Sequence, residues 1–290
     1  MRQPPTLIVQ ERCATGEGPL WNPFDQHVYW TDIPRGRIYR FDPRSGRHDL
    51  CFEGGVVGGF TIQSDGSLLL FMGRGRVQRW QDGQATTIID ELPAERSTRF
   101  NDVIADPAGR VFCGTMPDDQ GRARLYRLET DGSIALVLDR LGQANGMGFT
   151  PDGGGLYLTD TKANTITRFR YDQRSGDLSE PEIVVQLPGE YPALDGLVID
   201  SAGHLWAAHY GGSCLACYDG QGREVERIAL PTSRVTSAGF GGDGADLYIT
   251  TAGGDETTPE EDPAAGGLFH LRLDVRGRAE FRSQVRADAT

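Results

Sequence analysis

Four side chains that carry a carboxylate or amide oxygen occur in similar local sequence contexts along this chain. Each lies among small residues, next to an apolar run, and each precedes a turn residue by eight positions. They are Glu17 in GEGPLW, Asn101 in STRFNDVIADPAGR, Asn145 in QANGMGFTPDG and Asp195 in YPALDGLVIDSAGHLW. Carboxylate and amide oxygens suit hard or borderline divalent cations, and two carboxylates would nearly neutralise such an ion. The pattern therefore predicts a site for one divalent cation: Ca²⁺, Mg²⁺, Mn²⁺, Zn²⁺ or Fe²⁺.

A cation with few protein ligands keeps coordination positions for water and for a substrate. It can polarise a carbonyl oxygen and lower the pKa of a bound water, so the predicted chemistry is hydrolytic. The alternative is that Asn145-Gly146 and Asp195-Gly196 are ordinary turn pairs, because both dipeptides are common in turns. We favour the cation site because separate turns do not explain one offset shared by four residues.

The same offset reveals a repeat that must position these side chains. Six segments combine a turn rich in Asp, Pro or Gly with short apolar strands on either side. Their turn residues are separated by 41, 43, 44, 50 and 41 positions, and they are Asp25, Gly66, Gly109, Gly153, Gly203 and Gly244. A repeat of about 40–50 residues with about four short strands is typical of a propeller blade.

We therefore expect an all-β fold, a six-bladed β-propeller that forms a single domain over residues 1–290. Helix should be nearly absent, because no stretch of a dozen residues keeps a 3.6-residue apolar period. A closed ring must join its ends. We expect the N-terminal strand TLIVQER to pair with the C-terminal segment GLFHLRLDVRG.

In a propeller, equivalent positions of successive blades face the same axis. Glu17, Asn101, Asn145 and Asp195 should therefore meet in the central channel. The corresponding positions of the other two blades are Gly58 and Thr236. Because both residues lack a charge and are small, we expect them to leave room for a substrate beside the cation.

Composition narrows the class of protein. The net charge of −12 and the pI of about 4.9 argue against nucleic acid as a partner, since phosphate binding needs clustered Lys and Arg. The mean hydropathy is −0.41, and no apolar run approaches the ~20 residues of a membrane span. The first residues also lack the apolar stretch that is typical of a secretory signal. We expect a cytoplasmic protein that does not bind membranes. Its five cysteines should be reduced, and the CLAC stretch of Cys214 and Cys217 should hold buried structural thiols. The oligomeric state is left open.

At these residues the chain resembles the SMP-30/gluconolactonase/regucalcin family of six-bladed propellers. The resemblance covers nearly the whole length, and it is carried by GEGPLW, RFNDVIADPAGRVFCGTM, NGMGFTPDGGGLYLTDT, YPALDGLVIDSAGHLWAAHYGG, VTSAGFGG and AGGLFHL. It implies metal-dependent hydrolysis of a sugar lactone, such as gluconolactone, xylonolactone or arabinolactone, to the aldonic acid. It further implies that Glu17, Asn145 and Asp195 bind the metal. Arg99 and Asn101 would bind substrate, and Asp195 would also be the general base.

Some features depart from that family. After GTM, only Asp118 and Asp119 are candidates for the acidic residue that some members use on sugar hydroxyls, and the Asp195 loop carries two extra residues, Ala193 and Leu194. We expect His209 to be a packed histidine, with contact to the substrate as the alternative. The acidic stretch 253–267 is expected to be a solvated loop, with a cover over the site as the alternative.

Two other functions stay open: a metal-dependent organophosphate or aryl-ester hydrolase, and a non-enzymatic calcium-binding protein.

Overall fold

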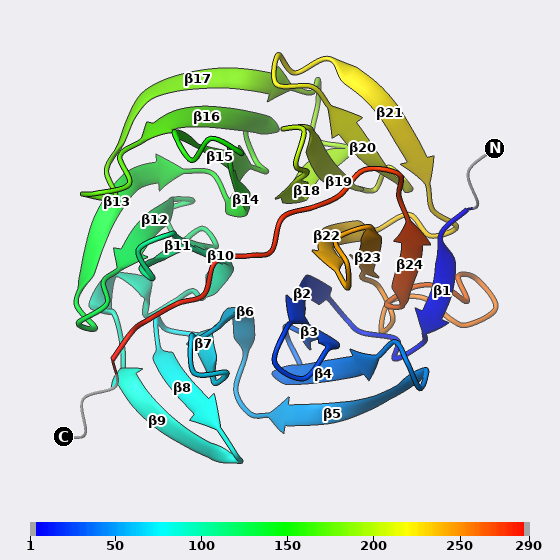
Figure 1. Ribbon diagram of the computed structural model, residues 1–290, viewed down its shortest axis with the longest axis horizontal. Helices are drawn as coiled ribbons and strands as arrows, with labels where there is room; N and C mark the ends of the chain where they lie inside the picture. Colours follow the sequence, from blue (N-terminus) through cyan, green and yellow to red (C-terminus); the bar gives the residue numbers. More distant parts are fainter. Residues whose placement is uncertain (1–3, 287–290) are drawn as a thin grey trace.

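Six four-stranded antiparallel sheets surround one axis in the computed structural model, which describes residues 4–286 (Figure 1). In five sheets the strands follow chain order from the axis outward, and the sixth has the order β1-β24-β23-β22. The expected all-β, six-bladed propeller is confirmed. The expected single domain also includes residues 1–3 and 287–290, which lie outside the described residues.

The strands are short, and each sheet takes about one sequence repeat. The first two sheets contain β2 (Gly16–Asn22), β3 (His27–Asp32), β4 (Arg37–Asp42), β5 (Arg47–Glu53), β6 (Val57–Ile62), β7 (Leu68–Met72), β8 (Val77–Gln81) and β9 (Gln84–Ile89). The next two contain β10 (Phe100–Ala105), β11 (Val111–Thr115), β12 (Ala123–Leu128), β13 (Ile134–Leu141), β14 (Ala144–Phe149), β15 (Gly155–Asp160), β16 (Thr165–Tyr171) and β17 (Leu178–Gln186). The last two contain β18 (Ala193–Ile199), β19 (Leu205–Tyr210), β20 (Cys214–Tyr218), β21 (Glu224–Ala229), β22 (Val235–Gly241), β23 (Asp246–Thr251), β24 (Leu268–Arg272) and β1 (Thr6–Val9).

Glycine is required in the turns that define the repeat. Gly109 has a φ of 84° and Gly203 a φ of 88°, a region that L side chains rarely adopt. These turns join the first strand of a sheet to its second, and Gly109 N donates to the carbonyl oxygen of Asp106 (3.0 Å). The local turn chemistry therefore sets the spacing of the blades along the sequence.

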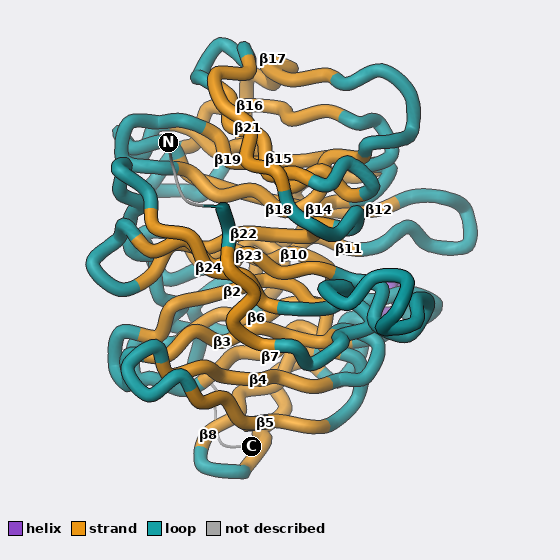
Figure 2. Tube along the Cα trace, turned by 90° about the vertical axis from the view of Figure 1, so that its right-hand side faces the viewer, coloured by secondary structure: helices purple, strands orange, loops and turns teal. Residues whose placement is uncertain are grey.

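Most of the core lies between neighbouring sheets. Between the fifth and sixth sheets, for example, Trp206 of β19 belongs to one buried cluster with Phe240 of β22 and Phe269 of β24. Aromatic and branched side chains stabilise such contacts because packing between the sheets removes their large apolar surfaces from water. From the side, strands form the body and loops lie at its two faces (Figure 2). The loops of the site are thus held by packed sheets.

The N-terminal strand closes the ring, as expected. β1 pairs antiparallel with β24, with Thr6 opposite His270 and Leu7 opposite Phe269. The last sheet therefore takes its outermost strand from the beginning of the chain and its other three from the end. Pairing both termini in one sheet removes two exposed edges.

A segment that the sequence did not predict follows β24. We call residues 273–286 the C-terminal strap; it crosses the ring over its centre (Figure 1, red). Gly277 bridges to Asp200, and Ser283 bridges to Gln63. Both partners lie in or next to the loops between first and second strands, so the strap covers that face of the ring.

Two smaller expectations concern thiols and helices. Cys214 and Cys217 are both buried in β20, and no cysteine within residues 4–286 takes part in a disulfide, as expected for structural thiols. The one helix of that range is the 3-10 turn η1 (Pro93–Glu95), and no helix there is long and apolar enough to cross a bilayer.

Candidate active site at the ring axis

The five side chains singled out from the sequence line one cavity of about 270 Å³. Glu17 comes from β2, Asn101 from β10, Asn145 from β14 and Asp195 from β18, while Arg99 directly precedes β10. The loops before the first strands and between the second and third strands form its walls. The cavity therefore opens on the face opposite to the C-terminal strap.

A repeated bulge turns these side chains to the axis. In each innermost strand the pairing register shifts at the offset position, for example between Glu17 and Leu20, and between Leu194 and Leu197. A bulge adds an unpaired residue and redirects the local side chains. In β2 the shift spans Gly18, whose φ of 57° favours glycine, and Pro19, which has no N–H to lose. The residues around Glu17 thus form a bulge that presents a carboxylate.

Asn145 and Asp195 contact each other directly. The Nδ2 atom of Asn145 donates to Oδ1 of Asp195 and to the hydroxyl of Thr161 (3.0 Å). The amide oxygen Oδ1 of Asn145 is buried and has no hydrogen-bond partner. Glu17, Asn145 and Asp195 are 5%, 1% and 8% exposed. An unpartnered buried oxygen in a cavity that two buried carboxyl groups also line is an arrangement that a cation would satisfy.

Electrostatics at the site are unbalanced toward negative charge. Burial, and then the charges of Asp195 and Asp102, raise the pKa of Glu17 well above its ordinary value. Burial and then the charge of Asp102 likewise raise the pKa of Asp195, and burial raises the pKa of Asp102 to about 6. Arg99 is the cation that opposes all three, and burial lowers its own pKa. A bound divalent cation would relieve this repulsion.

Arg99 and Asn101 form a connected pair. One guanidinium nitrogen of Arg99 donates to Oδ1 of Asn101 (2.7 Å) and to the carbonyl oxygen of Phe100 (2.9 Å). Asn101 Nδ2 donates to the carbonyl oxygen of Ala144 (2.9 Å), which joins the third blade to the fourth. Both side chains are thus held in place next to the predicted cation ligands.

The β15–β16 loop, residues 161–164, and Asp160 at the end of β15 were missed as part of the site. Thr161 accepts from Asn145 and donates to the carbonyl oxygen of Leu194 (2.8 Å), which connects the strands of two predicted ligands. Asp160 accepts from the backbone N–H of Gln143 (3.0 Å). A turn after a strand was visible in TDTKAN, but nothing in the sequence indicated which partners it would meet.

Asn164 fastens a second loop to the cavity. Its Nδ2 atom donates to the carbonyl oxygens of Gly189 (3.1 Å) and Pro192 (3.0 Å), and its Oδ1 accepts from the N–H of Leu194 (2.8 Å). The loop between these contacts carries Tyr191, which is 67% exposed and lines the cavity. One buried amide therefore holds the loop that leads into Asp195.

Other candidates lie elsewhere. His209 is 1% exposed, bonds to the Tyr218 hydroxyl through Nε2 (2.9 Å) and does not line the cavity; burial lowers its pKa to about 4. The carboxylate of Asp118 accepts from Arg124 (2.9 Å), and neither Asp118 nor Asp119 lines the cavity. None of these three residues therefore belongs to the lining of the candidate site.

The expectation of open space beside Gly58 and Thr236 is wrong. A Cβ atom on Gly58 would come within 1.9 Å of the carbonyl oxygen of Phe100, so the next blade already fills that space. Thr236 donates its hydroxyl to the carbonyl oxygen of Gly16 (2.6 Å). Small residues at these positions permit close packing of the innermost strands, and the cavity opens over the other blades.

The acidic stretch 253–267 is anchored rather than wholly solvated. Glu256 pairs with Arg234, whose guanidinium lies 5.9 Å from the centre of the Tyr210 ring, and Tyr210 lines the cavity. None of residues 253–267 lines the cavity itself. The stretch therefore contacts a wall of the site through Arg234 and does not cover it.

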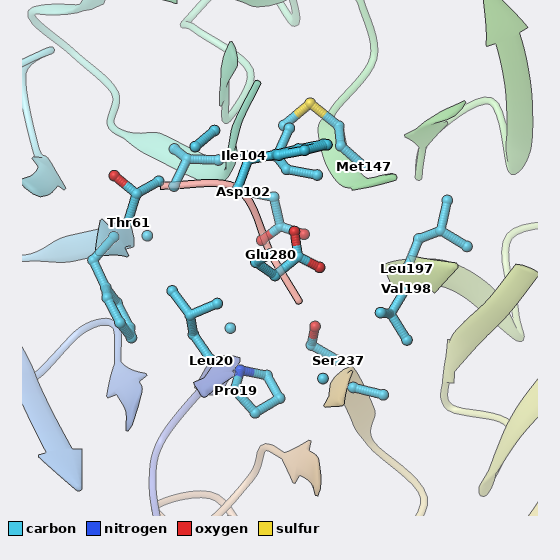
Figure 3. A pocket seen from close by; sticks show the side chains of 18 of the residues that line it. Pro19, Leu20, Thr61, Asp102, Ile104, Met147, Leu197, Val198, Ser237 and Glu280 are labelled. Atoms are coloured by element: carbon cyan, nitrogen blue, oxygen red, sulfur yellow. The ribbon is translucent and has the colours of Figure 1, made fainter. Parts of the chain in front are cut away.

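A second, smaller cavity of about 90 Å³ lies farther along the axis. The side chains of Asp102 and Glu280 both point into it (Figure 3). Glu280 belongs to the C-terminal strap, and its side chain keeps contact with solvent, but the protein around it removes part of its hydration and so raises its pKa to about 7. Within residues 4–286 no group of three or more His, Cys, Asp or Glu side chains is arranged to hold a metal ion. The donor set at the main cavity is instead two carboxylates and one amide.

Comparisons with known proteins agree with this architecture. Residues 15–253 match the profile of the SMP-30/Gluconolactonase/LRE-like region. The chain is 49% identical over 292 residues to pentonolactonase XacC of Haloferax volcanii, covering 97% of this chain and 98% of that protein. It is 31% identical over 280 residues to regucalcin of Danio rerio, covering 93% and 95%. The crystal structure of regucalcin, a calcium-binding protein from Agrobacterium tumefaciens, superposes with a TM-score of 0.90 at 24% identity, covering 98% of both chains.

Proposed function

This chain belongs to the SMP-30/gluconolactonase/LRE-like family, and we propose that it hydrolyses a sugar lactone to the aldonic acid with one divalent cation. The 49% identity to a pentonolactonase over nearly the whole of both chains favours a five-carbon lactone such as xylonolactone or arabinolactone, with gluconolactone as the next candidate. The site residues carry the argument for the reaction.

The observation that carries the proposal is the meeting of Glu17, Asn145 and Asp195 at one cavity, with Oδ1 of Asn145 buried and unpartnered. These three side chains would hold the cation. Oxygen donors of this kind suit Ca²⁺, Mg²⁺ or Mn²⁺, and Zn²⁺ or Fe²⁺ less selectively. When bound, the cation supplies Lewis-acid stabilisation of the negative charge that develops on a carbonyl oxygen under attack. The calcium-binding regucalcin of similar fold supports a divalent ion without deciding which one.

Asp195 is the proposed general base. Asn145 Nδ2 donates to Oδ1 of Asp195, which leaves Oδ2 to accept a proton from the attacking water. A carboxylate held in place to accept a proton from the attacking water can act as a general base. Arg99 and Asn101, already bonded to each other, would donate to sugar hydroxyls and orient the lactone carbonyl toward that water.

The test is acid release from xylonolactone, arabinolactone and gluconolactone at constant pH, before and after chelation with EDTA. We expect chelation to abolish turnover and one divalent ion to restore it. Asp195→Asn should reduce kcat by about 100-fold or more and weaken lactone binding far less. Full activity after verified metal removal, or equal loss of binding and turnover, would contradict the proposed roles. Cation binding without turnover of any lactone or aryl ester would favour a non-enzymatic calcium-binding protein.

A further inference from the structure

Lys162 is the sole lysine of this chain. The other 28 basic side chains among the 29 Lys and Arg residues are arginines. Most arginines of the described residues pair with a carboxylate, as Arg170 does with Glu180 (3.0 Å) and Arg40 with Asp49 (3.1 Å). Since arginine serves nearly everywhere else, the one position that carries lysine calls for a chemical reason.

Lys162 lies at the candidate site. It belongs to the β15–β16 loop and lines the same cavity as Glu17, Asn145 and Asp195. Its side chain is exposed, and no carboxylate of residues 4–286 comes within the 4.0 Å of an ion pair. The ammonium is therefore available to a molecule that enters the cavity.

The base of this side chain is fixed, although its end is free. Asp160 accepts from the N–H of Ala163 (3.3 Å), and Asn164 is held by the contacts described above, so both flanks of Lys162 are constrained. A Cβ atom on Gly142 would come within 2.5 Å of the Lys162 Cβ, so Gly142 lets the lysine stem lie close to the backbone. Such anchoring lowers the conformational entropy lost when the ammonium binds a ligand.

Lysine and arginine present different donors. Guanidinium is a planar fork that matches carboxylates, whereas ammonium is a compact charge with three donors that can adapt to a hydroxyl oxygen. The cavity already has one guanidinium, Arg99, which is engaged with Asn101 and Phe100. Lys162 thus adds an uncommitted donor on the fourth blade, which neighbours the blade of Arg99 and Asn101.

We propose that Lys162 is a specificity-determining residue whose ammonium donates a hydrogen bond to a hydroxyl group of the bound lactone. The inference rests on the proposed lactonase function and names the residue through which the site would prefer polyhydroxylated lactones to unsubstituted ones. A site that hydrogen-bonds a substrate hydroxyl disfavours an analogue that lacks it. Lys162 makes no bond to the reacting atoms, so its effect falls on recognition.

Lys162→Met tests the proposal, because methionine keeps the stem length without the charge. With xylonolactone, we expect kcat/KM to fall about tenfold to a hundredfold, the range for a hydrogen bond to a charged group. With γ-butyrolactone, which lacks hydroxyls, the change should stay below about twofold. Arg170→Met, which removes an exposed charge on β16 outside the cavity lining, is the matched control and should change neither value.

A second readout does not depend on turnover. Reductive methylation with ¹³C-formaldehyde should label only Lys162 and the N-terminal amine, and the Lys162 signal is the one that Lys162→Met lacks. We expect xylonate to shift that signal and butyrate at equal concentration to leave it unchanged. Wild-type turnover of xylonolactone with an unshifted signal, or an equal fall of kcat/KM for both lactones in Lys162→Met, would overturn the proposal. Absence of turnover by the wild type on any lactone would overturn the proposed function instead, whatever the labelled amine does.

Discussion

A divalent cation should stabilise this protein by an amount that can be estimated. A ligand at 100 times its Kd adds about 2.7 kcal/mol to the free energy of unfolding. At about 2.1 cal/mol/K per residue, a chain of 290 residues has an unfolding entropy of about 0.6 kcal/mol/K. The Tm should therefore rise by about 4 °C when the chelated protein is given the cation at that concentration. Differential scanning calorimetry measures this shift.

Asp195→Asn should remove the shift. Mutation of a residue that only supports a metal ligand commonly lowers the metal affinity by about 10–100-fold. Loss of one of the two ligating carboxylates should therefore lower the cation affinity on the order of 100-fold. At the same cation concentration the gain would then be about 0.4 kcal/mol, less than about 1 °C in Tm. Asp49→Asn, which changes an exposed carboxylate paired with Arg40, should retain the wild-type shift.

Without the cation, the charge of Asp195 should destabilise the folded protein. Burial and the Asp102 charge raise the folded-state pKa of Asp195, and a carboxyl group with a raised folded pKa destabilises the protein increasingly as the pH rises from its unfolded pKa toward its folded pKa. Asp195→Asn should therefore leave the cation-free Tm unchanged or raise it at pH 8. A variant that keeps the full cation shift, or that loses several degrees without cation, would refute the assignment of Asp195 as a ligand.

Three further predictions concern the surroundings of the site. Asn164→Asp keeps the acceptor for Leu194 N–H but removes both donors, so it should lower kcat/KM about tenfold with a Tm loss of a few degrees; unchanged lactone kinetics would contradict its positioning role. Glu280 has a folded pKa of about 7 against about 4.3 unfolded, so its charge costs stability as the pH rises between those values. The Tm of Glu280→Gln minus that of the wild type should therefore grow from pH 5 to pH 8 in thermal melts, and a constant difference would count against it. Gly58→Ala should cost roughly 3 kcal/mol or more in urea unfolding, because its Cβ would meet the Phe100 carbonyl oxygen at 1.9 Å; Gly55→Ala, with a nearest contact of 3.6 Å, is the control and should change little.

The repeat was readable from the sequence because propeller blades are built from local signals. A turn glycine such as Gly109, with its φ of 84°, and short strands on both sides recur at each blade. The pairing of β1 with β24 also followed, since a ring of blades must close. What could not be foreseen was the C-terminal strap, because its contacts with Gln63 and Asp200 are made by turns distant in sequence and without a shared pattern.

For the candidate site as well, the sequence predicted some features correctly and others wrongly. Equal offset from the repeat turn grouped Glu17, Asn101, Asn145 and Asp195, and the structure brings all four to one cavity. The same offset misjudged Gly58, whose lack of a side chain serves the close approach of Phe100. Sequence position tells which residues are equivalent, but free space depends on the neighbouring backbone.

The sequence by itself determined the number of blades, their spacing along the chain and the oxygen-bearing positions that face the axis, because turn chemistry and alternation act over a few residues. Only the tertiary structure decided which loops complete the cavity. Asn164 and Lys162 come from one loop: Asn164 bonds to Pro192, 28 residues away, and Lys162 lines the cavity. Side-chain contacts between blades depend on how sheets pack, and no local pattern records that packing.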